Sequence, residues 1–480
     1  MTKSLKWKPS RQQRTFIENY SKYLDTGRAA LFVGAGLSRS AGYVDWRGLL
    51  DGIAKELDLD INKEHDLVAV AQFFLNAKKT RNGLNEAIIE EFEKDATLTN
   101  NHYLLARLPI RSIWTTNYDR LIESAFDSAG RGVDVKLEDE DFALWHRGDT
   151  ILYKMHGDVK QPHKAVLTKD DYETYGTSHP LFLQHLKMDL ITKHFLFLGF
   201  SFTDPNLERV FSAVRVLSKA NGPQHFAIIR DVKNEKGGNR RRMELWIEDL
   251  KRFNIETILI SEYSQIELLL EAISRFVHRK SIFVSGSSRG AALLDTDPQA
   301  TYDDLARTLG TRLISDGFNV VSGFGVGLGE QVVLGALKAL HSVNALQGRV
   351  TVRPFPTAPQ EASEQRQLNT RTREDLIARS GTVIFIGGSQ IADGDLLPSR
   401  GVLEEFEIAT RLKRFIIPVG STGHASAKIW KTVSDNFDSF YPSADRSLRE
   451  YFDKLALSSP KVSDLIDTIM AMVRIAASSD

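Results

Sequence analysis

Short, continuous apolar runs separated by helical segments constrain the fold of this chain more than any other feature. The first run, Ala29–Val33, ends in a glycine turn. A run that is apolar at every position is typical of a parallel strand buried on both faces. Segments with the spacing of an amphipathic helix, such as Leu67–Leu75 and Leu84–Phe92, lie between the runs. This alternation predicts an α/β domain with a mainly parallel sheet. Further strands are predicted at Ser112–Thr116, Ile151–Met155, Phe195–Phe200, Phe226–Ile229 and Thr257–Ile260.

The alternation restarts after the basic cluster His278–Lys280. We therefore place a domain boundary close to residue 280 and predict two Rossmann-like α/β domains, residues 1–280 and 281–480. The second domain is expected to have about five strands. Its strands are predicted at Ser281–Val284, Val320–Ser322, Val350–Pro354, Thr382–Ile386 and Phe415–Val419, and its helices near Asp303–Ile314, Glu330–Leu340, Thr372–Arg379 and Leu403–Leu412.

The charge balance argues against several classes of protein. The 480 residues carry 62 Lys and Arg against 62 Asp and Glu, so the formal net charge is zero. A nucleic-acid coat normally has a basic excess, and a disordered chain has fewer hydrophobic residues than the 42% found here. The basic start, Met1–Arg14, lacks the apolar core of a secretion signal, and the longest apolar stretch, His194–Phe202, is too short to cross a bilayer. We expect a cytoplasmic protein that binds neither nucleic acid nor membrane.

The chain contains no cysteine, which excludes disulfides, thiolate zinc sites and cysteine nucleophiles. Its 12 histidines show no His-Glu-x-x-His motif or other tight metal-binding spacing. We therefore expect no metal, zinc included, and no bound cofactor.

A glycine turn follows the first predicted strand and leads into a predicted helix. It reads Gly34-Ala35-Gly36-Leu37-Ser38. Backbone amides and a helix N-terminus at such a turn can face a pyrophosphate. The third glycine of the usual dinucleotide fingerprint is missing, because Arg39 occupies its place. A tight structural turn therefore explains the pattern about as well as a phosphate site.

Polar side chains also follow two other predicted strands of this domain. Asn117 comes directly after one strand and His156 after another. The carboxyl ends of parallel strands form one edge of a sheet, which is where ligands bind in such folds. Taken singly, an Asn here is most often a turn former and a His most often a surface or core residue. Three such strand ends in one sheet favour a shared site.

These motifs, in this order, resemble the NAD-binding motifs of the sirtuin (SIR2) superfamily. The resemblance implies that Asn117 orients the nicotinamide ribose and the reacting water, and that His156 is the general base. It also implies that Ser38 and Ser201 line the NAD pocket. The full set of NAD-binding residues implied is Gly34, Ala35, Gly36, Ser38, Asp119, Gly199 and Ser201.

Two departures from the sirtuin pattern bear on which molecule, water or an acetylated peptide, accepts the ADP-ribosyl group. Protein-deacylating sirtuins carry a four-cysteine zinc ribbon that this chain cannot build. They also carry Ile-Pro-Asp-Phe-Arg where this chain has Tyr43-Val44-Asp45-Trp46-Arg47. Water is therefore a more plausible acceptor than an acetylated peptide. A neutral imidazole, with an ordinary pKa of about 6.5, suits the deprotonation of water at neutral pH.

Glycine-rich turns also end two predicted strands of the second domain. The first includes Gly286 and Ser287, and the second has glycines at four alternate positions. So many glycines let backbone N–H groups approach a phosphate closely, and a purely structural turn seldom needs them. Arg353, Arg371 and Arg373 follow, and arginine is a strong phosphate donor, although any one could be a surface group. The second turn contributes Gly323, Phe324, Gly325 and Gly327 as candidates.

This half resembles the SLOG family, relatives of the LOG hydrolases that bind nucleotide-derived ligands. LOG hydrolases have a Pro-Gly-Gly-x-Gly-Thr-x-x-Glu loop. Here an insertion separates Gly387-Gly388 from Gly401, and Val402 replaces the threonine, while Glu405 keeps the glutamate place. Because the loop of the LOG hydrolases is interrupted here, the resemblance favours a sensor over a hydrolase.

Together the two halves resemble, across nearly the whole chain, the SIR2–SLOG effectors of the bacterial Thoeris antiphage systems. Shared stretches include Tyr153–Asp158, Leu196–Asn206 and Val321–Gly325. The resemblance implies an NAD+ hydrolase that is switched on when a cyclic ADP-ribose isomer occupies the SLOG pocket. A TIR-domain partner would make this signal after phage infection, and the loss of NAD+ would halt the cell.

The same resemblance implies that Arg373, Gln390 and Glu405 grip the signal. Gln390 departs from the lysine of the family, which would weaken a phosphate contact or change the preferred isomer. The family also suggests a homotetramer. Three alternatives stay open at this point: a non-enzymatic NAD or ADP-ribose sensor, a protein deacylase, and a LOG-type phosphoribohydrolase that would depend on Glu405.

Overall fold

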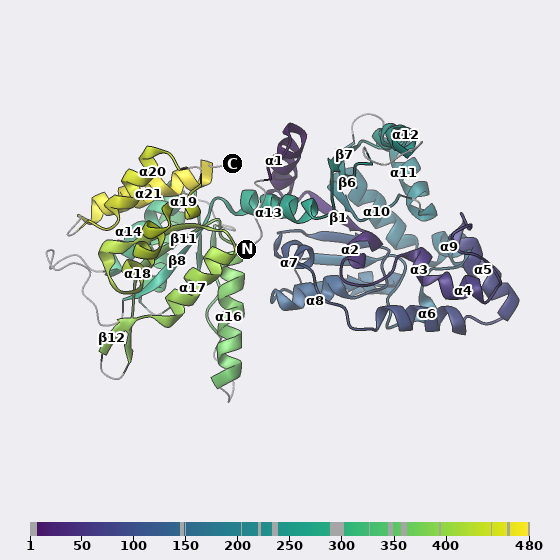
Figure 1. The fold of residues 1–480 in the computed structure, drawn as a ribbon, viewed down its shortest axis with the longest axis horizontal. Helices are drawn as coiled ribbons and strands as arrows, with labels where there is room; N and C mark the ends of the chain where they lie inside the picture. Colours follow the sequence, from purple (N-terminus) through teal and green to yellow (C-terminus); the bar gives the residue numbers. More distant parts are fainter. Residues whose placement is uncertain are drawn as a thin grey trace. The chain divides into compact units, whose positions relative to one another are not determined.

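The computed structural model divides into two compact units, residues 1–274 and 275–480, which are drawn in Figure 1. Among the described residues, no helix has the length and apolar character that a membrane span requires. The structure describes residues 7–144, 148, 150–202, 204–218, 222–232, 239–288, 302–325, 327–343, 349–356, 362–392, 395–442, 444–457 and 461–478.

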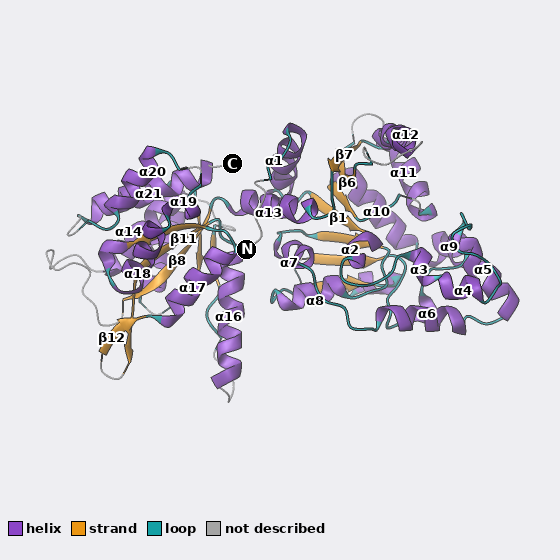
Figure 2. Ribbon diagram, viewed as in Figure 1, coloured by secondary structure: helices purple, strands orange, loops and turns teal. Residues whose placement is uncertain are grey.

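The first unit is built around a parallel seven-stranded sheet with the order β3-β4-β2-β1-β5-β6-β7 (Figure 2). Six of its strands were predicted from the sequence, each to within two residues at either end. They are β1 Ala29–Val33, β2 Ser112–Thr115, β4 Thr150–Lys154, β5 His194–Leu198, β6 His225–Arg230 and β7 Ile255–Ile260.

The seventh strand, β3 (Val133–Lys136), lies at the edge of the sheet and was not predicted. Its buried side chains are Asp134 and Lys136, whose charged groups pair at 3.0 Å. The strand therefore buries a charged pair where a typical strand buries apolar residues, and for this reason its sequence contains no apolar run.

Helices connect these strands, as parallel pairing requires. The first helix begins with a capping box, in which the Ser10 hydroxyl accepts from the Gln13 N–H and the Gln13 side chain accepts from the Ser10 N–H. The helices of this unit are α1 Arg11–Asp25, α2 Ala35–Arg39, α3 Trp46–Leu49, α4 Asp51–Lys55, α5 Leu67–Lys78, α6 Asn82–Phe92, α7 Asn100–Arg107, α8 Leu121–Ser128, α9 Lys169–Ser178, α10 Pro180–Thr192, α11 Pro205–Ser218 and α12 Asn239–Lys251, with short 3₁₀ turns at Asp139–Ala143 and Pro162–Lys164. Helix α13, Gln265–His278, begins in this unit and ends in the second.

The second unit holds a six-stranded sheet, with the order β10-β9-β8-β11-β12 and with β13 also paired to β11. Among the described strands of this unit, only β12 runs antiparallel, because it forms a hairpin with the second half of β11. The hairpin is visible in Figure 1, and β12 is the strand of this unit that the sequence analysis missed. The strands are β8 Ser281–Ser288, β9 Asn319–Ser322, β10 Val350–Val352, β11 Thr382–Ala392, β12 Asp395–Pro398 and β13 Phe415–Val419.

Two helices of this unit, α14 and α15, pack unusually closely. A β-carbon on Gly310 of α14 would lie 2.1 Å from the Val332 carbonyl oxygen, and one on Gly335 of α15 would lie 1.9 Å from that of Arg307. Both glycines are therefore required by the contact. The helices are α14 Tyr302–Ser315, α15 Leu328–Val343, α16 Ala362–Ala378, α17 Arg400–Arg411, α18 His424–Asp435, α19 Phe437–Phe440, α20 Arg446–Lys454 and α21 Val462–Ser478, with a 3₁₀ turn at Gly420–Thr422.

Candidate functional site

The glycine turn after β1 packs directly on the turn after β5. The Gly34 N–H donates to the Leu198 carbonyl and the Gly36 N–H to the Gly199 carbonyl, each at 2.9 Å. A β-carbon on Gly34 would lie 2.4 Å from the Gly199 oxygen. Gly199 itself has a φ of +64°, in the left-handed region that favours glycine. The N–H groups of Gly34 and Gly36 thus donate to protein carbonyls. These two bonds connect the turn after β1 to the turn after β5.

Replacing Gly34 by alanine is expected to lower the free energy of unfolding by about 1–3 kcal/mol, because the new methyl group would force two backbone segments apart. Urea unfolding of the full chain measures this. Gly52→Ala is the matched control: Gly52 lies in α4, and a β-carbon there would have no atom within 4 Å. That change should stabilise slightly, because alanine is the better helix former. Equal stability of Gly34→Ala and wild type would contradict the packing argument.

The other predicted residues of this turn region differ in exposure. Ala35 begins α2, a helix of five residues. Ser38 lies in the same helix and is buried, whereas Ser201, beyond β5, is exposed. The predicted helix N-terminus therefore belongs to a helix of little more than one turn. The dipole of so short a helix adds little to any binding of phosphate.

A buried hydrogen-bond network joins the turns that follow β1 and β2. Ser38 Oγ donates to Asp119 Oδ2 at 2.7 Å and accepts from Asn117 Nδ2 at 3.0 Å. Asp119 Oδ1 accepts from the Leu121 N–H, and Thr115 Oγ1 accepts from the Asn117 N–H, both at 3.0 Å. The network holds the Asn117 carboxamide in one orientation, with its nitrogen toward Ser38. The structure thus brings together three of the predicted residues, Ser38, Asn117 and Asp119.

His156 leaves the sheet at the same edge as Asn117. Strands β2 and β4 are paired in parallel with Thr115 opposite Lys154, and each of the two site residues comes two positions later. The imidazole of His156 is 1% exposed. Burial lowers its pKa below the ordinary value of 6.5, while the negative charge of Asp204 raises it in part. The ring is therefore neutral near pH 7, as a general base must be.

A buried lysine ties the two strand ends together beneath these residues. Lys154 Nζ donates to the Asp119 carbonyl at 2.6 Å and to Glu123 Oε1 at 3.1 Å, and it pairs with Asp158. The side chains of Lys154 and Asp158 are fully buried. One cation therefore links the turn that carries Asn117 to the turn that carries His156.

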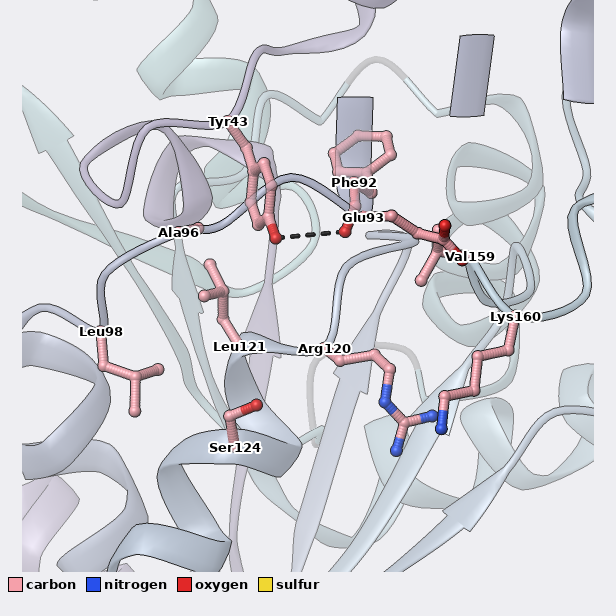
Figure 3. A pocket seen from close by; sticks show the side chains of 10 residues that line it. All are labelled: Tyr43, Phe92, Glu93, Ala96, Leu98, Arg120, Leu121, Ser124, Val159 and Lys160. Carbon is pink, nitrogen blue, oxygen red and sulfur yellow. Dashed lines mark hydrogen bonds between the residues drawn. The ribbon is translucent and has the colours of Figure 1, made fainter. Parts of the chain in front are cut away.

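A cavity of about 220 Å³ adjoins the two turns (Figure 3). Arg120, which follows Asp119, and Lys160, which comes two positions after Asp158, project from its wall. On the far side, the Tyr43 hydroxyl donates to the Phe92 carbonyl at 3.1 Å. Neither Asn117 nor His156 lines this cavity, so it is a neighbour of the predicted NAD pocket and is distinct from it.

In the second unit, two of the predicted signal-binding residues are in direct contact. Arg373 Nε, in α16, lies 3.4 Å from Glu405 Oε1, in α17, and Arg373 Nη1 lies 2.9 Å from Glu404 Oε2. Ser285, in β8, donates its hydroxyl proton to Glu405. The guanidinium also lies over the Phe355 ring, 5.1 Å from the centroid. These groups form a partly buried polar cluster, in which Ser285 and Glu405 are the buried members.

Burial raises the pKa of Glu405, and the bonds from Ser285 and Arg373 partly offset that rise. The third predicted residue, Gln390, contacts the start of α17, the helix that carries Glu405: its Oε1 accepts from the Arg400 N–H at 3.1 Å. Ser287 donates its hydroxyl proton to the Ser389 carbonyl.

The predicted glycines of this unit serve different purposes. A β-carbon on Gly286 would lie 2.1 Å from the Ile386 carbonyl oxygen, and one on Gly323 would lie 2.7 Å from the Phe355 ring, so both permit close packing. By contrast, a β-carbon on Gly325 would meet open space. Gly327 has a φ of +89°. Phe324 also has a positive φ, +52°, which is strained for an aromatic residue, and its side chain is 42% exposed.

Within the described part of the chain, no group of three or more His, Asp and Glu side chains is placed to hold a metal ion. The predicted absence of zinc and of a bound cofactor stays a prediction.

Two family models match this chain. The one described as SIR2-like domain matches residues 111–258. The one described as Sir2- and TIR-associating SLOG family matches residues 265–476. The protein named NAD(+) hydrolase ThsA from Bacillus cereus (strain MSX-D12) is 39% identical over 473 residues, which are 96% of this chain and 98% of that protein. This chain belongs to the ThsA family.

Two further proteins of the same name support this assignment. The one from Cytobacillus dafuensis is 37% identical, over 96% of each chain. The one from Acinetobacter baumannii (strain 532279) is 35% identical, over 92% of this chain and 95% of that protein. Membership of the ThsA family confirms the resemblance seen in the sequence and the predicted order of a SIR2-like half before a SLOG half. The curated members of this family are enzymes, named as NAD(+) hydrolases.

The sequence analysis missed three contacts at these sites. It did not place the Asp204 carboxylate, which caps α11, against His156. It named neither Lys154 as the link beneath the two turns nor Glu404 as the partner of Arg373. A buried-strand pattern interrupted by a lysine was the available signal for Lys154. No local pattern signals the other two contacts.

Proposed function

We propose that this member of the ThsA family hydrolyses NAD+ to nicotinamide and ADP-ribose at the carboxyl edge of its first sheet. The observation that carries this proposal is the placing of an oriented carboxamide, Asn117, and a neutral buried imidazole, His156, on neighbouring strand ends. The glycine turn, with Ser38, Asp119, Gly199 and Ser201, would form the walls of the NAD pocket. We assign this activity to residues 1–280.

The reaction needs little from the protein beyond position and one base. Nicotinamide in NAD+ is cationic and leaves as a neutral molecule, taking the electrons of the glycosidic bond. Water forms the new bond to the ribosyl carbon, and His156 takes its proton. Asn117 would orient the ribose and the water, and orientation of this kind contributes several kcal/mol to a barrier.

We propose further that residues 281–480 bind a cyclic ADP-ribose isomer and that this binding switches on the hydrolase. The pairing of Arg373 with Glu405 supports this, because arginine binds phosphate and a carboxylate binds ribose hydroxyls. In this structure the Glu404 carboxylate pairs with the Arg373 guanidinium, so a phosphate that binds Arg373 would have to displace Glu404. A switch of this kind requires the signal to bind one state of the protein better than another.

The matching SLOG model is described as TIR-associating, which supports a TIR-domain partner as the source of the signal. We propose that the enzyme acts in the cytoplasm as a homotetramer. Depletion of NAD+ would then halt an infected cell, which is an abortive form of antiphage defence.

Nicotinamide release from NAD+ by the purified full chain, with and without cyclic ADP-ribose isomers, tests both proposals. Release that rises with one isomer supports them. Binding without any release would favour a non-enzymatic sensor. Deacylation of an acetylated peptide in the same assay would favour the protein deacylase. Release at the same rate with and without every isomer would retain the hydrolase and remove the switch.

Arg373→Ala is expected to raise the isomer concentration that gives half-maximal activation by about 10- to 100-fold, because a charge-assisted hydrogen bond to phosphate is lost. The maximal rate should be unchanged, since the hydrolytic residues are untouched. Titration of nicotinamide release against the isomer measures this.

Two further variants test the assignment of Arg373, one as a matched control and one with the opposite expected effect. Arg411→Ala removes an exposed α17 arginine that pairs with Glu374, and it should leave the titration unchanged. Glu404→Gln should shift half-activation to lower concentration, because the competing carboxylate is gone. Superimposable curves for Arg373→Ala and wild type would refute the assignment.

A further inference from the structure

The loop between β5 and α11 places a carboxylate against His156. Asp204 Oδ2 lies 3.2 Å from His156 Nε2, and the two side chains are 9% and 1% exposed. The Tyr172 hydroxyl donates to the same oxygen at 3.1 Å. The other oxygen, Oδ1, accepts from the N–H groups of Asn206 and Leu207 at 3.0 and 3.1 Å. Both oxygens are therefore engaged, and the orientation of the carboxylate is fixed.

This geometry bears on which nitrogen of His156 carries the proton. A carboxylate accepts hydrogen bonds and donates none. Asp204 therefore favours the tautomer with the proton on Nε2, which leaves a lone pair on Nδ1. Both ring nitrogens are buried and make no hydrogen bond to the described residues, but Nε2 has the Asp204 oxygen at ion-pair distance. Nδ1 is thus the nitrogen available to take a proton.

We propose that Asp204 is a positioning residue that holds His156 in the Nε2–H tautomer, so that Nδ1 accepts the proton of the attacking water. This inference rests on the proposed hydrolase function. When Nδ1 takes the proton, the imidazolium forms 3.2 Å from the carboxylate, whose charge stabilises it. Asp204 acts through His156 and needs no contact with NAD+.

The charged and titratable groups around His156 determine the sign of the pH effect. Burial lowers the pKa of His156 most strongly, Asp204 and Asp171 raise it, and His179 lowers it. Asp171 pairs with Arg81, and Tyr172 bonds Asp204, so Asp204 is the main group that favours the protonated ring. Removing its charge must lower the pKa further. A base works only when it is unprotonated, and a His156 of lower pKa stays unprotonated to lower pH. The acidic limb of the pH–rate profile would therefore move to lower pH.

Asp204→Asn is the sharpest test, because the α11 cap fixes which way the amide lies. Its oxygen must keep accepting from Asn206 and Leu207, so its NH₂ group faces His156 Nε2 and donates to it. The proton of the ring then moves to Nδ1, and the base is lost. We expect kcat to fall by about 100-fold or more, because the analogous Asp→Asn change in the Ser-His-Asp triad, which leaves the wrong tautomer, costs about 10⁴-fold. The acidic limb of kcat/KM should shift to lower pH.

Two other variants separate this role from support of the fold. Asp445→Asn changes a comparable helix cap in the second unit, where Asp445 accepts from the Leu448 N–H, and it should leave kcat and the pH profile unchanged. Tyr172→Phe keeps the ring and removes the donor to Asp204. The freed charge should raise the pKa of His156, so the acidic limb should shift to higher pH, opposite to Asp204→Asn.

Wild-type kcat with an unshifted limb in Asp204→Asn would overturn the proposal. If that variant does not fold, Tyr172→Phe decides, and an unshifted limb there would overturn it equally. A wild type that releases no nicotinamide would instead refute the proposed function. In that case ¹⁵N shifts of the His156 ring still test the tautomer, and a proton found on Nδ1 would overturn the inference.

Discussion

Replacing His156 by alanine is expected to slow activated nicotinamide release by about 10²- to 10⁴-fold, the usual contribution of a general base. The side chain is the buried, neutral group at the strand end next to Asn117, and alanine leaves the water with no base. The measurement is kcat for NAD+ in the full chain with saturating isomer. Asn117→Ala should also lower kcat strongly, because the orienting carboxamide and its bond to Ser38 are lost.

The matched control is His163→Ala, which removes an exposed histidine seven positions further along the chain. That variant should turn over NAD+ at the wild-type rate. Far-UV circular dichroism and the melting temperature establish that each variant folds. A folded His156→Ala protein with a wild-type kcat would remove this histidine from the chemistry and with it the mechanism proposed here.

Replacing Lys154 by methionine is expected to lower the free energy of unfolding by about 3–5 kcal/mol. Methionine keeps most of the volume, so little of the loss comes from a cavity. The cost arises because Glu123 and Asp158 stay buried without the lysine, and Asp158 keeps only the partly exposed Arg120, whose Nη1 lies 3.7 Å from Oδ2. The Asp119 carbonyl also loses its donor, which loosens the turn that carries Asn117. Urea unfolding of the full chain measures the effect.

An exposed pair provides the control for Lys154. Lys55 bonds Asp51 four residues earlier in α4, and its side chain is 72% exposed. Lys55→Met should change the free energy of unfolding by less than about 1 kcal/mol. Adding Asp158→Asn to Lys154→Met should recover part of the loss, because one buried charge disappears. An equal effect of the two lysine variants would show that the buried network contributes no special stability.

Most of the sheet of the first unit could be predicted because its strands are buried on both faces. Ala29–Val33 is apolar at every position, and it forms β1 at the predicted bounds. Two edge strands, β3 and β12, could not be predicted in this way. β3 buries Asp134 and Lys136, and β12 exposes Leu396 and Leu397, so neither has the apolar burial pattern of a central strand.

The predicted site residues are those that stand directly after strands, since parallel strands deliver them to one edge. Asn117 and His156 follow paired positions of β2 and β4, and Ser38 reaches Asn117 from the turn after β1. The purpose of the glycines was harder to predict. Gly34 and Gly36 suggested a phosphate-binding turn, and the structure has their N–H groups bonded to the Leu198 and Gly199 carbonyls.

The sequence by itself determined the two α/β halves, their family and the strand ends that carry polar residues, because burial periodicity and short motifs are local properties of the chain. The tertiary structure alone decided which side chains touch. Asp204 meets His156, and Glu404 meets Arg373, across 48 and 31 positions of the chain. Contacts over such separations depend on how helices pack on a sheet, and no local pattern of residues encodes that packing.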